Sequence, residues 1–342
     1  SPGGSVARAD LPCALVSDLG GAGVSQRNVV IQGGPWGAPA GGGRWHLSER
    51  RREAVWGIVF AAPWLIGLIG LTTLPTLASV VFSFTDYELV KWPPKFLGAY
   101  NYVKLFTNDP RFMKALANTL FIVALGVPSQ MIAGLLLALL LNQRVRGLGL
   151  YRTFFFLPSQ ITGVSLAFMW GWILNPQFGI LSYILAVFGI KSPLWLADPN
   201  WVKPAFVIMG LWGVGTSMII WLAGLQSIPD IYYEAAQIDG AGRLHRFWNI
   251  TMPLLTPTTF FTLITGVIGS FQVFTQAYVL TKGGPNDASL FYALYVFEKA
   301  FKVFQMGYAC ALAWVLFIVI MALTLLNLKL SKSWVYYEAE KE

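Results

Sequence analysis

The sequence predicts an all-α integral membrane protein that folds as a bundle of six transmembrane helices. Apolar residues make up 56% of the 342 residues and charged residues 12%, whereas soluble domains carry about 45–50% and about 25%. Mean hydropathy is +0.59. Six apolar runs are long enough for a helix to cross a hydrocarbon core of about 30 Å, and they are continuous rather than alternating, which argues against a β-barrel. This composition excludes a soluble enzyme and a disulfide-rich secreted domain.

The chain divides into three parts by composition. Glycine and proline recur through residues 1–49 without helical or strand periodicity. Such a segment cannot bury enough apolar surface to offset its ordering entropy. We therefore expect a disordered tail over residues 1–49, a transmembrane domain over 50–332 and a short cytoplasmic tail over 333–342.

Six predicted spans follow one another along the transmembrane domain. They cover residues 54–84, 115–141, 153–174, 204–225, 256–280 and 308–328. A seventh apolar stretch, residues 180–190, is too short to span and predicts an interfacial or re-entrant helix. Prolines inside the runs would break a soluble helix, but neighbouring helices can tolerate such kinks in a membrane bundle.

Charge predicts the orientation of the bundle. An even number of spans places both termini on one side of the membrane, and that side carries a small excess of Lys and Arg. Because cytoplasmic loops are enriched in these residues, we expect both termini in the cytoplasm. The net charge of +8 comes without the basic stripe interleaved with aromatic residues that a nucleic-acid reader needs, so no nucleic-acid partner is expected.

The predicted spans contain no Asp, Glu, Lys, Arg or His. Proton-coupled carriers retain such groups for their relays, so their absence argues against this class and against a strongly charged solute bound at mid-depth. Neutral polar groups remain. Gln272, Thr275 and Gln276 share a helix face through the i, i+3, i+4 spacing and, with Tyr278, are candidates for lining a translocation path. Hydrogen bonding between helices is the alternative role for such residues.

No catalytic or metal-binding constellation is visible. The two histidines, His46 and His245, lie apart from any Cys or carboxylate cluster with metal-ligand spacing. No Gly-Lys dipeptide occurs, so the chain has no Walker A loop. If nucleotide hydrolysis powers this protein, another polypeptide must perform it.

The loop between the fourth and fifth spans, residues 226–256, predicts two short helices. Pro229 and Asp230 are typical of a helix start, and Gly240 suits the left-handed residue that ends a helix. A second short helix is expected over residues 243–250. Ile231, Ala235 and Ile238 fall on one face of the first helix, so we expect a soluble partner to bury that face.

The same loop resembles the EAA signature of ABC importer permeases, EAA-x3-G-x9-I-x-L-P. Glu234-Ala235-Ala236 is followed at the family spacing by Gly240 and by Ile250-Thr251-Met252-Pro253. Met252 stands in place of Leu, a substitution that conserves volume. Asp239, together with segments 96–102 and 271–285, is similar to the carbohydrate-type permeases, the maltose and glycerol-phosphate group. The resemblance covers residues 50–337.

This resemblance implies a type I ABC importer permease with the MetI-like fold, which carries a sugar or sugar-like solute. It implies as partners a second permease subunit, two ATPase subunits that hold ATP and Mg²⁺, an extracytoplasmic solute-binding protein and membrane lipid, with no cofactor in this chain. The membrane is the plasma membrane of a bacterium or archaeon. The residues that would couple to the ATPase are Glu234, Ala235, Ala236, Asp239, Gly240, Ile250 and Pro253.

Two other classes of function stay open at this point. A stand-alone secondary carrier or channel would need coupling groups or a selectivity filter. A receptor or scaffold would move no solute. The carrier or channel would also leave the loop of residues 226–256 without a purpose.

Overall fold

The computed structural model describes residues 49–89, 91, 93–143, 146–161 and 163–336. The predicted disordered tail therefore lies outside the described residues except for Glu49, and so do residues 337–342 of the predicted C-terminal tail. The chain divides into two compact units, residues 1–61 and 62–342. Among the described residues the regular structure is helical, and β-structure is limited to two isolated bridges, Thr85–Phe96 and Glu88–Lys91.

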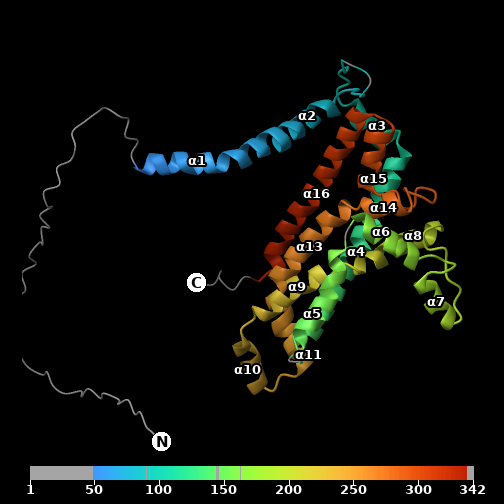
Figure 1. Cartoon of the computed structure of the whole chain (residues 1–342). Coiled ribbons are helices and arrows are strands. Elements are labelled where there is room, and N and C mark those ends of the chain that lie inside the picture. The colour runs from blue at the N-terminus through green and yellow to red at the C-terminus, as the bar shows by residue number, and fades with distance from the viewer. Residues whose placement is uncertain (1–48, 90, 92, 144–145, 162, 337–342) are drawn as a thin grey trace, which may run out of the picture. The chain divides into compact units, whose positions relative to one another are not determined.

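In the first unit, described residues 49–61 form the N-terminal part of helix α1 (Glu49–Gly67). The second unit continues this helix and holds all the others (Figure 1), in the order η1 (Leu68–Thr73), α2 (Leu74–Ser83), α3 (Tyr100–Thr107), α4 (Pro110–Leu141), α5 (Leu148–Phe156), η2 (Leu157–Gln160), α6 (Gly163–Ile173), α7 (Ile180–Val187), α8 (Pro199–Leu211), α9 (Val214–Gln226), α10 (Asp230–Ile238), α11 (Arg243–Arg246), η3 (Phe247–Thr251), α12 (Met252–Leu254), α13 (Thr256–Phe271), α14 (Thr275–Leu280), α15 (Tyr292–Phe297), η4 (Glu298–Lys302) and α16 (Met306–Trp334).

Within the described part of the chain, four helices are long and apolar enough to cross a membrane: Arg51–Ser83, Pro110–Leu141, Thr256–Leu280 and Met306–Trp334. The number rises to six when each of two bent pairs counts as one span. These pairs are Leu148–Gln160 with Gly163–Ile173, bent by 99°, and Pro199–Leu211 with Val214–Gln226, bent by 49°. The predicted helical bundle is thus confirmed.

Two of the predicted spans, residues 153–174 and 204–225, are each divided into two helices by a sharp bend. The first run ends in the 3-10 turn η2, which contains Pro158, a residue without an N–H for the helical hydrogen bonds. Helix resumes at Gly163, which has φ +65°. The second breaks at Trp212 and Gly213 between α8 and α9. The predicted short helix over residues 180–190 is present as α7, and its placement at a membrane surface stays a prediction.

Helix α4 lies at the centre of the packing, in contact with α8, α9 and α13, while α16 packs on α2, α13 and α15. The start of α4 is set by the pair Asp109-Pro110. The Asp109 side chain accepts a hydrogen bond from the Phe112 N–H at 3.2 Å, and Pro110 occupies the first helical position, where no N–H is needed. The pair Asp198-Pro199 starts α8 in the same way.

Small residues bring the helices close together, as expected where lipid supplies no hydrophobic drive for association. Gly215 at the start of α9 faces the backbone of α5, and a Cβ atom there would lie 2.9 Å from Cα of Phe156 and would also overlap the carbonyl oxygen of Phe155. Large apolar side chains such as Leu71, Leu140 and Phe168 are exposed on the outer surfaces of the second unit. Exposure of such surfaces to water costs free energy, whereas lipid chains can cover them without that cost.

Asp109 also ties three helices together at the end of the bundle where α4 begins. Its carboxylate accepts hydrogen bonds from the hydroxyls of Tyr295 in α15 and Tyr308 in α16. Partial burial raises the pKa of Asp109. The two hydroxyls, the Phe112 N–H and the nearby charge of Lys299 outweigh that effect and hold this pKa below its usual range.

We predict that the change Gly215→Ala destabilises the bundle by about 1–3 kcal/mol, because the added methyl group meets backbone that cannot rotate away. Gly149→Ala in α5, where nothing lies within 4 Å of the new Cβ, is the matched control and is expected to stabilise by about 0.5–1 kcal/mol. Thermal unfolding of the purified variants in detergent measures both. Equal melting temperatures for the two variants would contradict the close approach of α5 and α9.

A second prediction concerns acid. Because the pKa of Asp109 is lower in the folded state than in the unfolded state, its stabilising effect is complete above about pH 4 and is lost as the pH falls through the folded-state pKa. Asp109→Asn should lower the melting temperature at pH 7 and flatten its fall on acidification. Melting curves from pH 3 to 7 test this, and parallel curves for the wild type and the variant would count against it.

Candidate functional site

Helix α10 has well-defined ends. Pro229 precedes it in an extended conformation (φ −62°, ψ 135°), and Asp230 places a carboxylate in the first turn, where it favours the positive end of the helix dipole. After Ile238 the Ala241 N–H donates to the Ala236 carbonyl at 2.8 Å and the Gly240 N–H to the Gln237 carbonyl at 3.1 Å. With Gly240 at φ +78°, this is a Schellman motif, and the predicted helix end at Gly240 is confirmed.

The predicted second helix over residues 243–250 is longer than expected. It starts at Arg243 and runs through α11, the π-helical turn η3 and α12 to Leu254, two residues before α13. The Tyr233 hydroxyl and Oγ1 of Thr251 lie 3.0 Å apart, which fastens α10 to the second helix. We call residues 226–256, which hold both helices, the EAA-like loop.

The EAA-like loop turns its predicted contact residues outward. Glu234, Ala235, Asp239, Gly240 and Pro253 are exposed, whereas Ala236 and Ile250 are half-buried. The apolar side chains of this loop that are most exposed belong to both helices: Ile231, Ile238, Leu244 and Trp248. Ile238 is 87% exposed, so the apolar face expected from the sequence is open. A surface of this kind is suited to burial against another protein.

A cavity of about 440 Å³ lies inside the second unit, lined by residues of α4, η2, α6, α8, α9, α13 and α14. A smaller cavity of about 190 Å³ shares part of its wall. The residues common to both are Gln130, Gly213, Thr216, Thr265 and Gly266. The described residues that line the larger cavity include no ionisable side chain; their polar groups are amides, hydroxyls and the indole of Trp212.

Breaks in three predicted spans border this cavity. Pro158, Ile161 and Gly163 line it from the break before α6, and Trp212 and Gly213 line it from the bend between α8 and α9. Val273 lines it from residues 272–274, where α13 gives way to α14. Irregular backbone at membrane depth is tolerated where it lines a cavity. At the second break the Gly210 carbonyl accepts two hydrogen bonds, from Nε2 of Gln130 at 2.6 Å and from the Gly213 N–H at 3.1 Å.

The break at residues 272–274 corrects one expectation. Gln272 lies past the end of α13 and Thr275 begins α14, so the regular i, i+3, i+4 relation does not run through Gln272, Thr275 and Gln276. Gln276 lines the larger cavity, while Gln272, Thr275 and Tyr278 are not among its lining residues. Tyr278 instead stacks on Phe274, with ring centroids 5.4 Å apart.

Sequence reasoning missed Gln130. Its signal is an amide in the middle of the run 115–141, two residues after Pro128. The contact between Gln130 and the bend between α8 and α9 joins residues far apart in the sequence, so local sequence pattern could not predict it. No group of three or more His, Cys, Asp and Glu residues capable of holding a metal ion occurs among the described residues.

Comparison with known proteins places these features in a wider context. Residues 105–332 match the family described as "Binding-protein-dependent transport system inner membrane component". The chain is 41% identical over 296 residues to the probable ABC transporter permease protein YesP of Bacillus subtilis, covering 85% of this chain and 95% of the relative. It is 32% identical to the multiple sugar-binding transport system permease protein MsmF of Streptococcus mutans, with 81% and 95% coverage. It is 36% identical to the lactose transport system permease protein LacF of Rhizobium radiobacter, with 82% and 95% coverage.

A solved structure supports the fold. The chain is similar to a chain of a bacterial ABC transporter involved in the import of the acidic polysaccharide alginate, with a TM-score of 0.72 and 24% sequence identity over 83% of this chain and 96% of that chain. At this identity the likeness concerns the arrangement of helices.

The cavity makes a direct prediction about solvent access. Thr216 lines both cavities and is exposed, whereas Met218, two residues further along α9, is fully buried. In a background with Cys13→Ala and Cys310→Ala, Thr216→Cys should react quickly with a small water-soluble methanethiosulfonate reagent and Met218→Cys slowly. Intact-protein mass spectrometry follows the reaction. Equally slow reaction of the two thiols would mean that water does not reach the cavity.

Proposed function

Because the chain belongs to the family of binding-protein-dependent transport system inner membrane components, it is the membrane permease subunit of an ABC importer, and we propose that its cargo is a sugar or a sugar-like solute. The chain forms half of the translocation path and couples to a separate ATPase; ATP hydrolysis takes place on that other chain. The cargo assignment is carried by the uncharged cavity of about 440 Å³ in a protein whose relatives are named for sugar transport.

The cavity has the chemistry that a neutral sugar needs. Amide and hydroxyl groups such as those of Gln130, Thr216 and Gln276 can exchange hydrogen bonds with sugar hydroxyls, and the indole of Trp212 offers an apolar surface to a ring. A charged solute would find no counter-charge among the described lining residues. Gln272, Thr275 and Tyr278, on the same segment as Gln276, are proposed to meet the solute outside this cavity.

The EAA-like loop is proposed to be the contact with the ATPase. The exposed apolar side chains of α10 and α11–η3 would enter a cleft on that subunit, Glu234 would pair with a basic group there, and Ala235 and Ala236 would allow close approach. ATP and Mg²⁺ would be held by the ATPase, with no cofactor in this chain. ATP binding would draw two such loops together and shift the bundle from inward-open to outward-open.

The protein works with a solute-binding protein, as its family description states. Beyond that, we propose that the assembly contains a second, related permease chain and two ATPase subunits. The membrane is proposed to be the plasma membrane of a bacterium or archaeon, with both termini and the EAA-like loop in the cytoplasm. The end of the bundle where α4 begins then faces outward.

A stand-alone carrier or channel is the rival assignment. It would leave α10 with an open apolar face, whereas an importer covers it. Purification of the tagged chain from its own organism separates the two: an importer subunit brings an ATPase with it, and its solute uptake stops with a non-hydrolysable nucleotide. Uptake that continues without any ATPase would favour the carrier.

We predict that Glu234→Ala weakens docking of the ATPase by about 2–5 kcal/mol, since the basic group on the partner loses its counter-charge when it is buried. ATPase activity that depends on transport should fall accordingly. Glu88→Ala is the matched control, because it removes an exposed carboxylate from the loop between α2 and α3, away from the EAA-like loop. Normal assembly and normal coupled activity of Glu234→Ala would show that this carboxylate does not carry the contact.

A further inference from the structure

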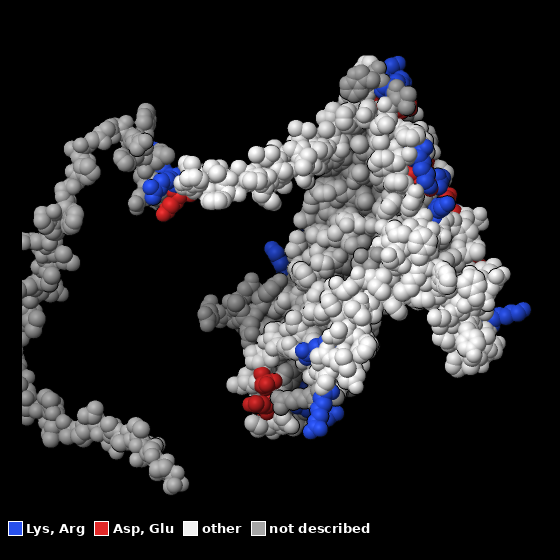
Figure 2. All heavy atoms as spheres, in the orientation of Figure 1, with Lys and Arg blue, Asp and Glu red and all other residues white. Residues whose placement is uncertain are grey.

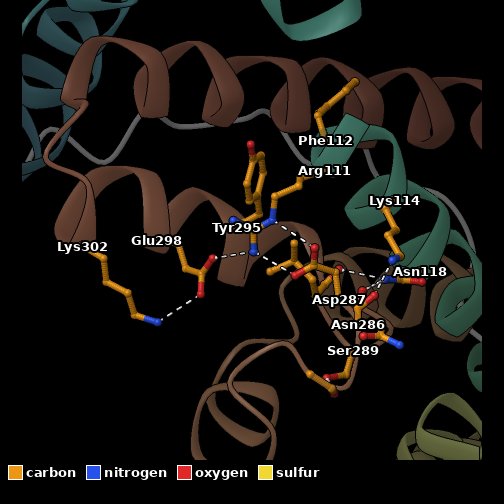
Figure 3. Close-up of polar contacts among 12 residues, drawn as sticks. Arg111, Phe112, Lys114, Asn118, Asn286, Asp287, Ser289, Tyr295, Glu298 and Lys302 are labelled. Atoms are coloured by element: carbon orange, nitrogen blue, oxygen red, sulfur yellow. Dashed lines mark hydrogen bonds and ion pairs between the residues drawn. The ribbon is translucent and has the colours of Figure 1, made fainter. Parts of the chain in front are cut away.

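The segment between α14 and α15, residues 281–291, is fastened to the start of α4. Arg111 binds Asp287 with two hydrogen bonds, from Nε at 3.1 Å and from Nη2 at 2.9 Å, and Nη2 also lies 3.2 Å from Oε2 of Glu298 (Figure 3). Lys302 in η4 binds the other oxygen of Glu298 at 3.0 Å. Lys114 donates to the Asn286 carbonyl. One ionic network therefore joins α4, the 281–291 segment and η4.

The backbone of this segment is fixed in an unusual shape. Lys282, Asn286 and Asp287 have φ values of 51°, 48° and 56°, in the left-handed region that costs free energy for residues other than glycine. Nδ2 of Asn118 donates to the carbonyls of Asp287 at 2.7 Å and Leu290 at 3.2 Å. Contacts from outside the segment thus hold its shape. Little conformational entropy of this segment is lost when a partner docks on it.

The network is polarised, with its acids inside and its cations outside. The side chain of Glu298 is 12% exposed and that of Asp287 32%, whereas those of Arg111 and Lys302 are 44% and 43% exposed. Lys114 and Lys282 are exposed as well. We call Arg111, Lys114, Lys282 and Lys302 the outer cationic surface. Figure 2 shows basic atoms, with a few acidic atoms among them, over this end of the bundle near α3 and α15, and a largely uncharged surface below them.

We propose that the outer cationic surface is the docking site of the solute-binding protein and that the face of the binding protein that meets it is acidic. The inference rests on the proposed function, because it requires this end of the bundle to face outward. Opposite potentials on two partners raise the association rate and fix their register. A rigid, hydrogen-bonded frame for the cations favours a protein partner, since attraction to anionic lipid headgroups needs no fixed geometry.

The test uses the complete importer in lipid nanodiscs, titrated with the binding protein encoded beside this chain and loaded with the sugar that it retains on purification. The readout is ATPase activity against binding-protein concentration. The double change Lys114→Glu with Lys302→Glu should raise the half-saturating concentration roughly tenfold at low salt, because charge steering mainly changes association rates. The maximal rate should stay unchanged, and the difference should shrink near 0.5 M salt, where the Debye length is only about 3–5 Å.

Lys191→Glu is the matched control, since it reverses an exposed cation after α7 and should leave the titration unchanged. Equal melting temperatures of the variants exclude misfolding, and Asp or Glu→Lys changes on the binding protein should restore docking to the double variant. An unchanged titration of the double variant would overturn the docking site while leaving the importer assignment intact. A change that appears only with anionic lipids would assign the surface to the membrane. No stimulation of the wild type by loaded binding protein would instead overturn the proposed function.

Discussion

A backbone in hydrocarbon must satisfy its own polar groups, and this constraint decides where the chain can depart from a regular helix. The breaks before α6, between α8 and α9 and between α13 and α14 all border the same cavity. At such a place side chains can reach the backbone, as Gln130 does at Gly210, whose carbonyl also accepts a hydrogen bond from the Gly213 N–H. The cavity and the breaks in the helices thus lie at the same place in the fold.

The same breaks connect the cavity to the EAA-like loop. Helix α9 starts at the bend beside the cavity and ends four residues before α10, while α13 leads from the end of the loop back to the cavity wall. Tyr233 and Thr251 hold the two helices of the loop together. Two helices packed against α4 thus connect the loop directly to the cavity, so a displacement of the loop has a short route to the cavity wall.

Local pattern was sufficient for some of these features and insufficient for others. The apolar runs predicted the bundle, and Pro229 with Gly240 predicted both ends of α10, because the signals lie within a few residues of the structure that they specify. The breaks at Gly163 and Gly213 were missed, since lipid and neighbouring helices determine whether a run bends. Arg111 and Asp287 are 176 positions apart, and Gln130 and Gly210 are 80 apart, so periodicity could not pair either. The fifth span was expected to be one continuous helix, and Gln272 was therefore assigned to the wrong helix face, because the break after α13 also depends on neighbouring helices.

The uncharged lining of the cavity has an electrical consequence. An inorganic ion that enters such a space exchanges its hydration shell for a few neutral dipoles, at a cost of several kcal/mol. A hydroxyl-rich neutral molecule exchanges one set of hydrogen bonds for another and meets no comparable barrier. The described residues that line the cavity therefore favour a neutral solute over sodium or potassium ions at this place in the bundle, which limits the movement of charge that accompanies solute uptake.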